Sequence, residues 1–227
     1  MSNASSRFIR AHAVAFLVQL CLFMPQPEDA HAERVRTAIP RATLNYLSIQ
    51  VAEEKGFFRA EGLENETVVI SGTTAIAATT NGDEALLAEK EGFRTLAFVG
   101  DLFPYPFQGF LATDKKIAEK PGEIKRWLRA MIRALVFIRE RPEEAADVAV
   151  KKLSLRNMSR PMLVEGVRRF VRALPDGVPG LPSQQGIKNV LDFDVKAPLK
   201  IKDDIPPEKV LSLRLVSEVK EELEAKR

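Results

Sequence analysis

One segment near the beginning of the chain limits the fold more than any other, because it reads as strand, helix, strand. Residues 35–39 alternate as on one face of a strand, and Thr67–Ile70 is a short apolar, β-branched strand. Between them, Leu44 to Lys55 places apolar side chains on one face of a helix. Gly56 follows as the helix stop, because glycine enters the left-handed conformation at little cost. This order predicts two parallel strands joined by a crossover helix.

A longer motif runs through the end of this unit, with the pattern AxxKGFFxxEGL. It resembles the opening of the periplasmic substrate-binding proteins of the nitrate/sulfonate/taurine type, a family that includes the fungal enzymes that make the thiamine pyrimidine. An unrelated strand–helix–strand unit with a glycine-capped helix is the alternative. The matching residues are Ala52, Lys55, Gly56, Phe57, Phe58, Glu61, Gly62 and Leu63.

The resemblance implies a lobe like that of the type II periplasmic binding proteins, with a mostly parallel sheet flanked by helices. In members of the family, the chain continues from this point into a second lobe and later returns to the first. Here residues 84–92 already resemble a helix that members form only after that return. The residues after Ala32 are too few for two full α/β lobes. We therefore expect one domain, 33–227, with the start of lobe one at 33–82, a return segment and C-terminal helices at 83–227, and the second lobe largely missing.

The first 32 residues have the pattern of a cleavable signal peptide. Arg7 and Arg10 precede an apolar run over residues 11–24, which is short for a membrane span. Ala30-His31-Ala32 supplies the small-x-small cleavage pattern, so cleavage is expected after Ala32. This predicts a periplasmic protein, and a retained membrane anchor is the alternative.

Cleavage at this point would remove Cys21, His12 and His31, which are all the cysteine and histidine in the chain. The mature protein would then lack the residues of cysteine proteases, Ser-His-Asp hydrolases and Cys/His zinc sites. An enzyme like the fungal pyrimidine synthases of the family is disfavoured, because those use a histidine. We expect no catalytic residue, no metal and no cofactor, and only a site made of carboxylates stays open.

Two turns are expected to supply the ligand-binding residues. Ser71, Gly72, Thr73 and Thr74 follow the second strand and precede a run of small residues, so their backbone N–H groups and a helix dipole suit an anion. A plain helix cap is the alternative for this turn. The resemblance places ligand contacts after the first two strands, which adds Asn45 and Tyr46, after Arg41–Thr43.

The rest of the chain extends the α/β pattern. Further strands are expected at Arg94–Val99 and Gly109–Thr113, giving a small, mostly parallel sheet near Val35, Val68, Leu96 and Phe110. Four helices are expected to start near Pro121, Pro142, Ser159 and Pro206–Pro207, the third ending at Leu174. The first is expected to carry one continuous apolar stripe that includes Trp127 and Met131, and the last an apolar face from Val210 to Leu223. Between the last two strands, Phe103, Tyr105 and Phe107 either line a pocket or pack on the sheet edge, and the edge is favoured.

The net charge of +3 and the pI near 9.0 are too mild to require nucleic acid. Two groups of arginines on the predicted helices are expected to form solvated faces or to contact an acidic partner. Nucleic acid is not expected for an exported chain, because the aromatic residues between these arginines, Trp127 and Phe170, belong to the apolar faces of the predicted helices and would not be free to stack on bases. The groups are Arg126, Arg129 and Arg133, and Arg168, Arg169 and Arg172.

The resulting hypothesis is an extracytoplasmic solute-binding component of an ABC importer. Its ligand would be a small anionic, sulfonate-, nitrate- or pyrimidine-like solute, which it would deliver to a permease in the membrane. The alternative is a shortened, non-transporting paralogue that acts as an interaction protein or no longer takes part in solute uptake.

Overall fold

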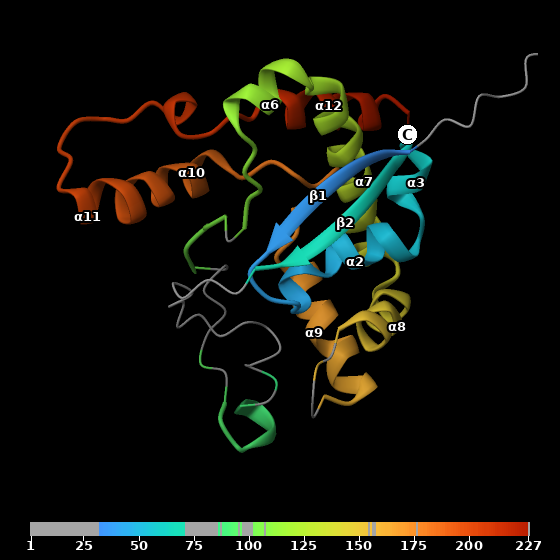
Figure 1. The fold of residues 1–227 in the computed structure, drawn as a ribbon. Helices are drawn as coiled ribbons and strands as arrows, with labels where there is room; N and C mark the ends of the chain where they lie inside the picture. The colour runs from blue at the N-terminus through green and yellow to red at the C-terminus, as the bar shows by residue number, and fades with distance from the viewer. Residues whose placement is uncertain are drawn as a thin grey trace, which may run out of the picture. The chain divides into compact units, whose positions relative to one another are not determined.

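The computed structural model describes residues 32–70, 86, 88–94, 96, 102–106, 108–153, 155, 158–175 and 177–226 (Figure 1). The chain divides into two units, residues 1–31 and 32–227, and the described residues all belong to the second. The predicted signal peptide therefore lies outside the described residues except for Ala32.

The described elements are mainly helices that follow one strand–helix–strand unit. In chain order they are β1 (Glu33–Ile39), the 3-10 helix η1 (Leu44–Tyr46), α2 (Leu47–Glu54), α3 (Phe57–Ala60), β2 (Leu63–Val69), α6 (Asp114–Glu119), α7 (Pro121–Glu140), α8 (Pro142–Lys152), α9 (Arg160–Arg172), α10 (Gln184–Val190), the π-helix η2 (Leu191–Lys196), α11 (Ala197–Leu199), the 3-10 helix η3 (Pro207–Lys209) and α12 (Arg214–Glu224).

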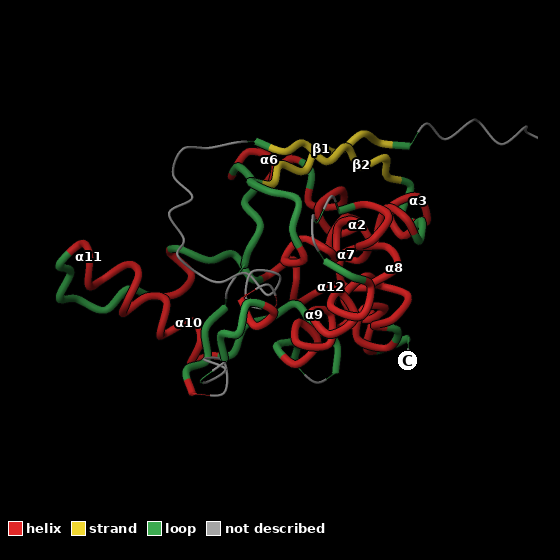
Figure 2. The backbone as a smooth tube through the Cα atoms, turned by 90° about the horizontal axis from the view of Figure 1, so that it is seen from below, coloured by secondary structure: helices red, strands yellow, loops and turns green. Residues whose placement is uncertain are grey.

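The sheet is the predicted parallel pair. β1 and β2 run in register from Glu33 opposite Leu63 to Ile39 opposite Val69. On β1, alternate residues from Val35 to Ile39 are buried, and Figure 2 shows α2, α3 and α7 on one side of the two strands. The other face carries solvent-exposed ion pairs, such as Arg34 with Glu64. One covered face explains the period-two pattern that the sequence shows.

Two glycines shape the connection between the strands, and the first does so as predicted. Gly56 has φ 71°, which ends α2 in the left-handed conformation and lets α3 begin at the next residue. Gly62 has φ 68° and turns the chain from α3 into β2. Phe58, between them, is buried in the main core.

Helix α7 lies at the centre of the packing and confirms the predicted apolar stripe from Pro121. One face carries Trp127, Met131 and Ile138 into the main core with α2, α3, α8 and α9. Its other face packs Ile132 against Val178 and, from α12, Val219. The predicted starts of α8 and α9 are also confirmed, and α9 ends at Arg172, two residues before the predicted Leu174.

The expected third and fourth strands are wrong for the residues that the structure describes. Leu96 is 85 % exposed and belongs to no strand, and neither do residues 108–113. Phe110 instead packs edge-on against the Trp127 ring, with the ring centroids 4.6 Å apart. A β-like pattern needs a neighbouring strand to accept its hydrogen bonds, and here the tryptophan provides a competing apolar contact. The fold class is therefore α/β with a two-stranded parallel sheet in the described part of the chain.

The C-terminal region also differs from its prediction. The prolines at 206 and 207 start only the short 3-10 helix η3, and α12 begins later, at Arg214. Val210 lies between the two and is exposed, whereas Leu215 and Val219 are buried against α7. The buried stripe of the last helix is therefore shorter than predicted.

The aromatic segment before α6 packs on η2 and α10, which differs from the expected sheet edge. Phe103 lies edge-on to Phe193, with ring centroids 5.3 Å apart, and stacks on Tyr105. The Tyr105 hydroxyl donates to Asp194, and Asn189 Nδ2 donates to the Pro104 carbonyl at 2.7 Å. Phe107, the third aromatic of that prediction, lies outside the described residues.

Candidate functional site

The carboxyl ends of β1 and β2 lie side by side. The backbone N–H of Ile70 donates to the Ile39 carbonyl at 2.9 Å, so the pairing continues to the last residue of β1. In α/β sheets, ligands bind outside the carboxyl ends of the strands, where the following loops begin. The structure therefore brings the segment after β1 to the edge where the sequence places a ligand.

The segment after β1 turns directly into a helical start. The Thr43 carbonyl accepts the backbone N–H of Tyr46 at 3.0 Å, which closes the first turn of η1, and η1 runs on into α2. Asn45 and Tyr46, the predicted ligand residues, are half-buried, and the Tyr46 side chain packs against the main core. The first turns of η1 and α2 contain no acidic residue. The positive end of the helix dipole is thus not offset by a carboxylate of those turns.

The other predicted ligand residues, Ser71, Gly72, Thr73 and Thr74, lie outside the described residues. Ile70, the residue just before them, is 56 % exposed. The structure thus places Asn45 and Tyr46 at the carboxyl end of the sheet and is silent on the second turn.

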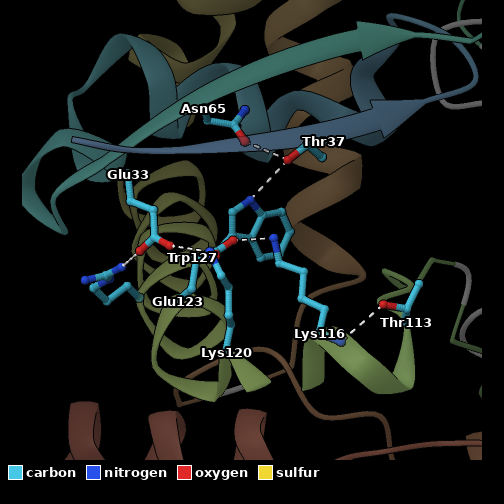
Figure 3. Close-up of polar contacts among 9 residues, drawn as sticks. Glu33, Thr37, Asn65, Thr113, Lys116, Lys120, Glu123 and Trp127 are labelled. Carbon is cyan, nitrogen blue, oxygen red and sulfur yellow. Dashed lines mark hydrogen bonds and ion pairs between the residues drawn. The ribbon is translucent and has the colours of Figure 1, made fainter. Parts of the chain in front are cut away.

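A chain of polar side chains lies between the sheet and α7 (Figure 3). The Trp127 ring N–H donates to the Thr37 hydroxyl at 3.1 Å, and that hydroxyl donates to Asn65 Oδ1 at 2.6 Å. Asn65 Nδ2 and the Thr67 hydroxyl both donate to Glu53 Oε1, at 3.0 and 2.6 Å. Side chains from both strands, α2 and α7 therefore satisfy one another beneath the sheet.

A charged cluster lies at the amino end of β1 (Figure 3). Lys120 contacts two carboxylates, Glu33 at 2.9 Å and Glu123 at 3.3 Å. Arg126 also pairs with Glu33, and Lys116 pairs with Glu123. The Glu123 side chain is only 4 % exposed, and its Oε1 is neutralised by the ion pair with Lys116 without a hydrogen bond of ordinary geometry. Glu123 also lies in the first turn of α7, where the helix dipole favours a negative charge.

These two polar sets support the fold and do not form a ligand site of their own. They lie under the sheet and at its amino end, and their polar groups are directed at one another, except that Arg126 Nε is buried without a hydrogen-bond partner in the described part of the chain. Sequence reasoning missed both sets: it treated Trp127 only as part of the apolar stripe and did not single out Glu123. The acidic residue in the first turn after Pro121, with Lys120 three residues before it, was the available signal for Glu123, but the pairing of Lys120 with Glu33 depends on tertiary packing.

The cluster predicts a pH dependence of stability. Hydrogen bonding from Lys120, together with Arg126, holds the pKa of Glu33 below its ordinary value of 4.5. Between the lowered folded pKa and 4.5 the unfolded chain binds more protons, so the stabilising contribution of Glu33 is present above 4.5 and is lost as the pH falls through the folded pKa. Thermal unfolding from pH 7 to pH 3 should show a Tm difference between the wild type and Glu33→Gln that is constant above about pH 5 and shrinks below it.

The matched control for this experiment is Glu64→Gln, which removes a carboxylate from the exposed pair with Arg34. Its Tm should stay close to that of the wild type at pH 7, because exposed ion pairs contribute little. A Glu33→Gln difference that grew toward pH 3 would contradict the assignment.

The predicted arginine faces are largely paired within the chain. Arg129 contacts Glu61 and Glu222, both at 2.8 Å, and Arg133 contacts Glu61 at 3.7 Å. On α9, Arg169 forms a two-pronged pair with Glu89 at 2.9 and 2.8 Å. Since these arginines bind acidic groups of the same chain, they are less available to an outside partner than the sequence suggests.

Comparison with known proteins adds no relative: no protein-family model and no curated protein matches the chain. Within the described ranges, no helix is long and apolar enough to cross a membrane. The same residues contain no group of three or more His, Cys, Asp or Glu side chains placed to hold a metal ion.

Proposed function

We propose that the chain is a periplasmic solute-binding component of an ABC importer. Its ligand would be a small anion or polar solute of the sulfonate, nitrate or pyrimidine kind, passed on to a membrane permease. Residues 33–227 contain no histidine or cysteine, so the proposed action is binding and release without chemical change.

One observation carries the proposal, which is the arrangement at the carboxyl end of the sheet. The two parallel strands end side by side, held by the bond from Ile70 to Ile39. The chain after β1 enters a helical start that has no acidic residue and places Asn45 and Tyr46 there. Backbone N–H groups at such a start bind anions through hydrogen bonds and the helix dipole.

The proposal predicts a rise in Tm with the right solute. Full-length protein would be heated with taurine, nitrate and 4-amino-5-hydroxymethyl-2-methylpyrimidine in separate titrations. A solute at about 100 times its Kd adds about 2.7 kcal/mol to the free energy of unfolding. For a domain of this size that corresponds to a Tm increase of about 5–10 °C.

Two variants locate the effect. Asn45→Ala removes a side chain at the carboxyl end of the sheet and should reduce the Tm response to the active solute. Gln184→Ala removes an exposed amide at the start of α10 and should leave the response unchanged. A full response in Asn45→Ala would contradict the assignment of this edge.

A second function is favoured by the small size of the sheet. The described part of the chain contains two strands, and Val69 and Ile70 at their carboxyl end are each more than half exposed. A shortened paralogue that binds another protein through this region would cover those apolar side chains on association. For that function, none of the three solutes should change the Tm.

A further inference from the structure

A second concave surface lies between α3, α7 and α12. It is an open hollow of about 570 Å³ and shares no residue with the carboxyl end of the sheet. Its floor is apolar: Ile132 and Val178 are almost fully buried beneath it, and Leu223 of α12 closes one side. Phe57 and Phe137 form its aromatic wall, edge-on to each other with ring centroids 6.2 Å apart.

Cationic side chains surround this apolar floor. Lys55 Nζ lies 4.6 Å from the centroid of the Phe137 ring, and the Arg141 guanidinium lies 5.7 Å from the same ring. The Arg133 guanidinium lies 4.7 Å from the Phe57 ring centroid. Contact with the aromatic faces holds these cations at the hollow. Lys226 is a fourth cation in the lining. Among the described lining residues, these four cations are accompanied by a single carboxylate, that of Glu140.

Nearby carboxylates neutralise the cations only in part. Glu144 is shared by Lys55 at 3.1 Å and Arg141 at 3.3 Å. Glu61 is likewise shared between Arg133 and a second arginine, Arg129. Arg129 is also paired with Glu222. Four cations, Lys55, Arg133, Arg141 and Lys226, therefore face three carboxylates, Glu61, Glu140 and Glu144, and one positive charge remains in excess around the apolar surface.

From this combination we infer that the hollow is a binding site for an amphiphilic organic anion, with an aromatic or aliphatic body and one carboxylate or sulfonate group. The body would lie on Phe57, Phe137 and Leu223, and the anionic group would reach Arg141 and Lys226. The volume falls in the range of about 300–1,000 Å³ that is typical of small-molecule sites. A hollow of this size suits a small molecule better than an extended protein surface.

The test is calorimetric titration of the full-length protein with three matched probes. Naphthalene-1-sulfonate has the required body and charge, 1-naphthalenemethanol has the body without charge, and 1-naphthylmethylammonium has the opposite charge. The sulfonate should bind at one saturable site, and the other two should bind at least about tenfold more weakly. Arg141→Gln and Lys226→Gln should each weaken sulfonate binding by about tenfold.

The control variant is Arg168→Gln, which makes the same charge change on α9, in an exposed pair with Glu143. It should leave sulfonate binding unchanged, and circular dichroism should show all three variants folded. Equal affinity for the alcohol, or unchanged affinity in both hollow variants, would overturn the inference. So would binding of hexaglutamate without binding of naphthalene-1-sulfonate, which would indicate an acidic protein partner.

The hollow and the carboxyl end of the sheet can be tested separately. Asn45→Ala should leave naphthalene-1-sulfonate binding intact, and Arg141→Gln should leave the Tm response to taurine or nitrate intact. Loss of sulfonate binding in Asn45→Ala alone would place the probe at the carboxyl end of the sheet and overturn the hollow as its site.

Discussion

Replacing Trp127 by alanine is expected to lower the free energy of unfolding by about 3–5 kcal/mol, as for other buried aromatic side chains. The ring joins separate parts of the fold: it contacts Phe58 at 6.2 Å and Phe110 at 4.6 Å between centroids, and its N–H binds Thr37. The Tm should fall by about 8–15 °C. Unfolding would be followed by circular dichroism, because Trp127 is the only tryptophan and the variant therefore has no tryptophan fluorescence.

Two further variants separate the ring from its hydrogen bond. Trp127→Phe keeps an aromatic ring but leaves Thr37 without its donor, so a smaller loss of about 1–2 kcal/mol is expected. Phe93→Ala removes an aromatic side chain that is 72 % exposed and should change stability by less than about 0.5 kcal/mol. A Trp127→Ala loss no larger than that of Phe93→Ala would contradict the central position of α7.

The second large effect is expected at the start of α2. Leu47 is fully buried in the main core, and Leu47→Ala should lower the free energy of unfolding by about 2–5 kcal/mol through lost burial and the cavity left behind. Because Leu47 directly follows Asn45 and Tyr46, its loss should also weaken the Tm response to the solute. Chemical denaturation measures the first effect and the thermal titration measures the second.

Leu199→Ala is the matched control, with the same atoms removed from a leucine on α11 that is 66 % exposed. Its free energy of unfolding should change by less than about 0.5 kcal/mol. Equal losses in the two leucine variants would contradict the burial of the predicted apolar face of α2.

Local patterns were sufficient where short-range rules govern the structure. The left-handed Gly56 and the stripe of α7 follow from conformational preference and helical periodicity, and the pairing of β1 with β2 follows from the strand–helix–strand order. The hydrogen bond from Trp127 to Thr37 joins residues 90 positions apart, so no local pattern reveals it.

The predictions that failed depend on neighbours far away in the chain. The segment around Phe110 has β-like residues but packs on Trp127 instead of pairing with a strand. The π-helix η2 was also not foreseen. The Ala197 N–H donates to the Asp192 carbonyl, five residues back, just before Pro198. Pro198 has no N–H and so cannot donate to the carbonyl four residues before it, which interrupts the regular helical pattern at this point.

The candidate site was predictable only in outline. Parallel strands and the turn after β1 place Asn45 and Tyr46 at the carboxyl end, as strand order alone implies. The hollow lined by Phe57 and Phe137 was not predictable, because it forms only where α12 packs beside α7.

The most direct test of solute binding at the carboxyl end of the sheet is a backbone amide NMR titration of the full-length protein with taurine and with nitrate. The account predicts saturable chemical-shift changes at the amides of Arg41 to Leu47 and of Ser71 to Thr74, with one of these solutes. Saturable shifts elsewhere, with those amides unmoved, would contradict it.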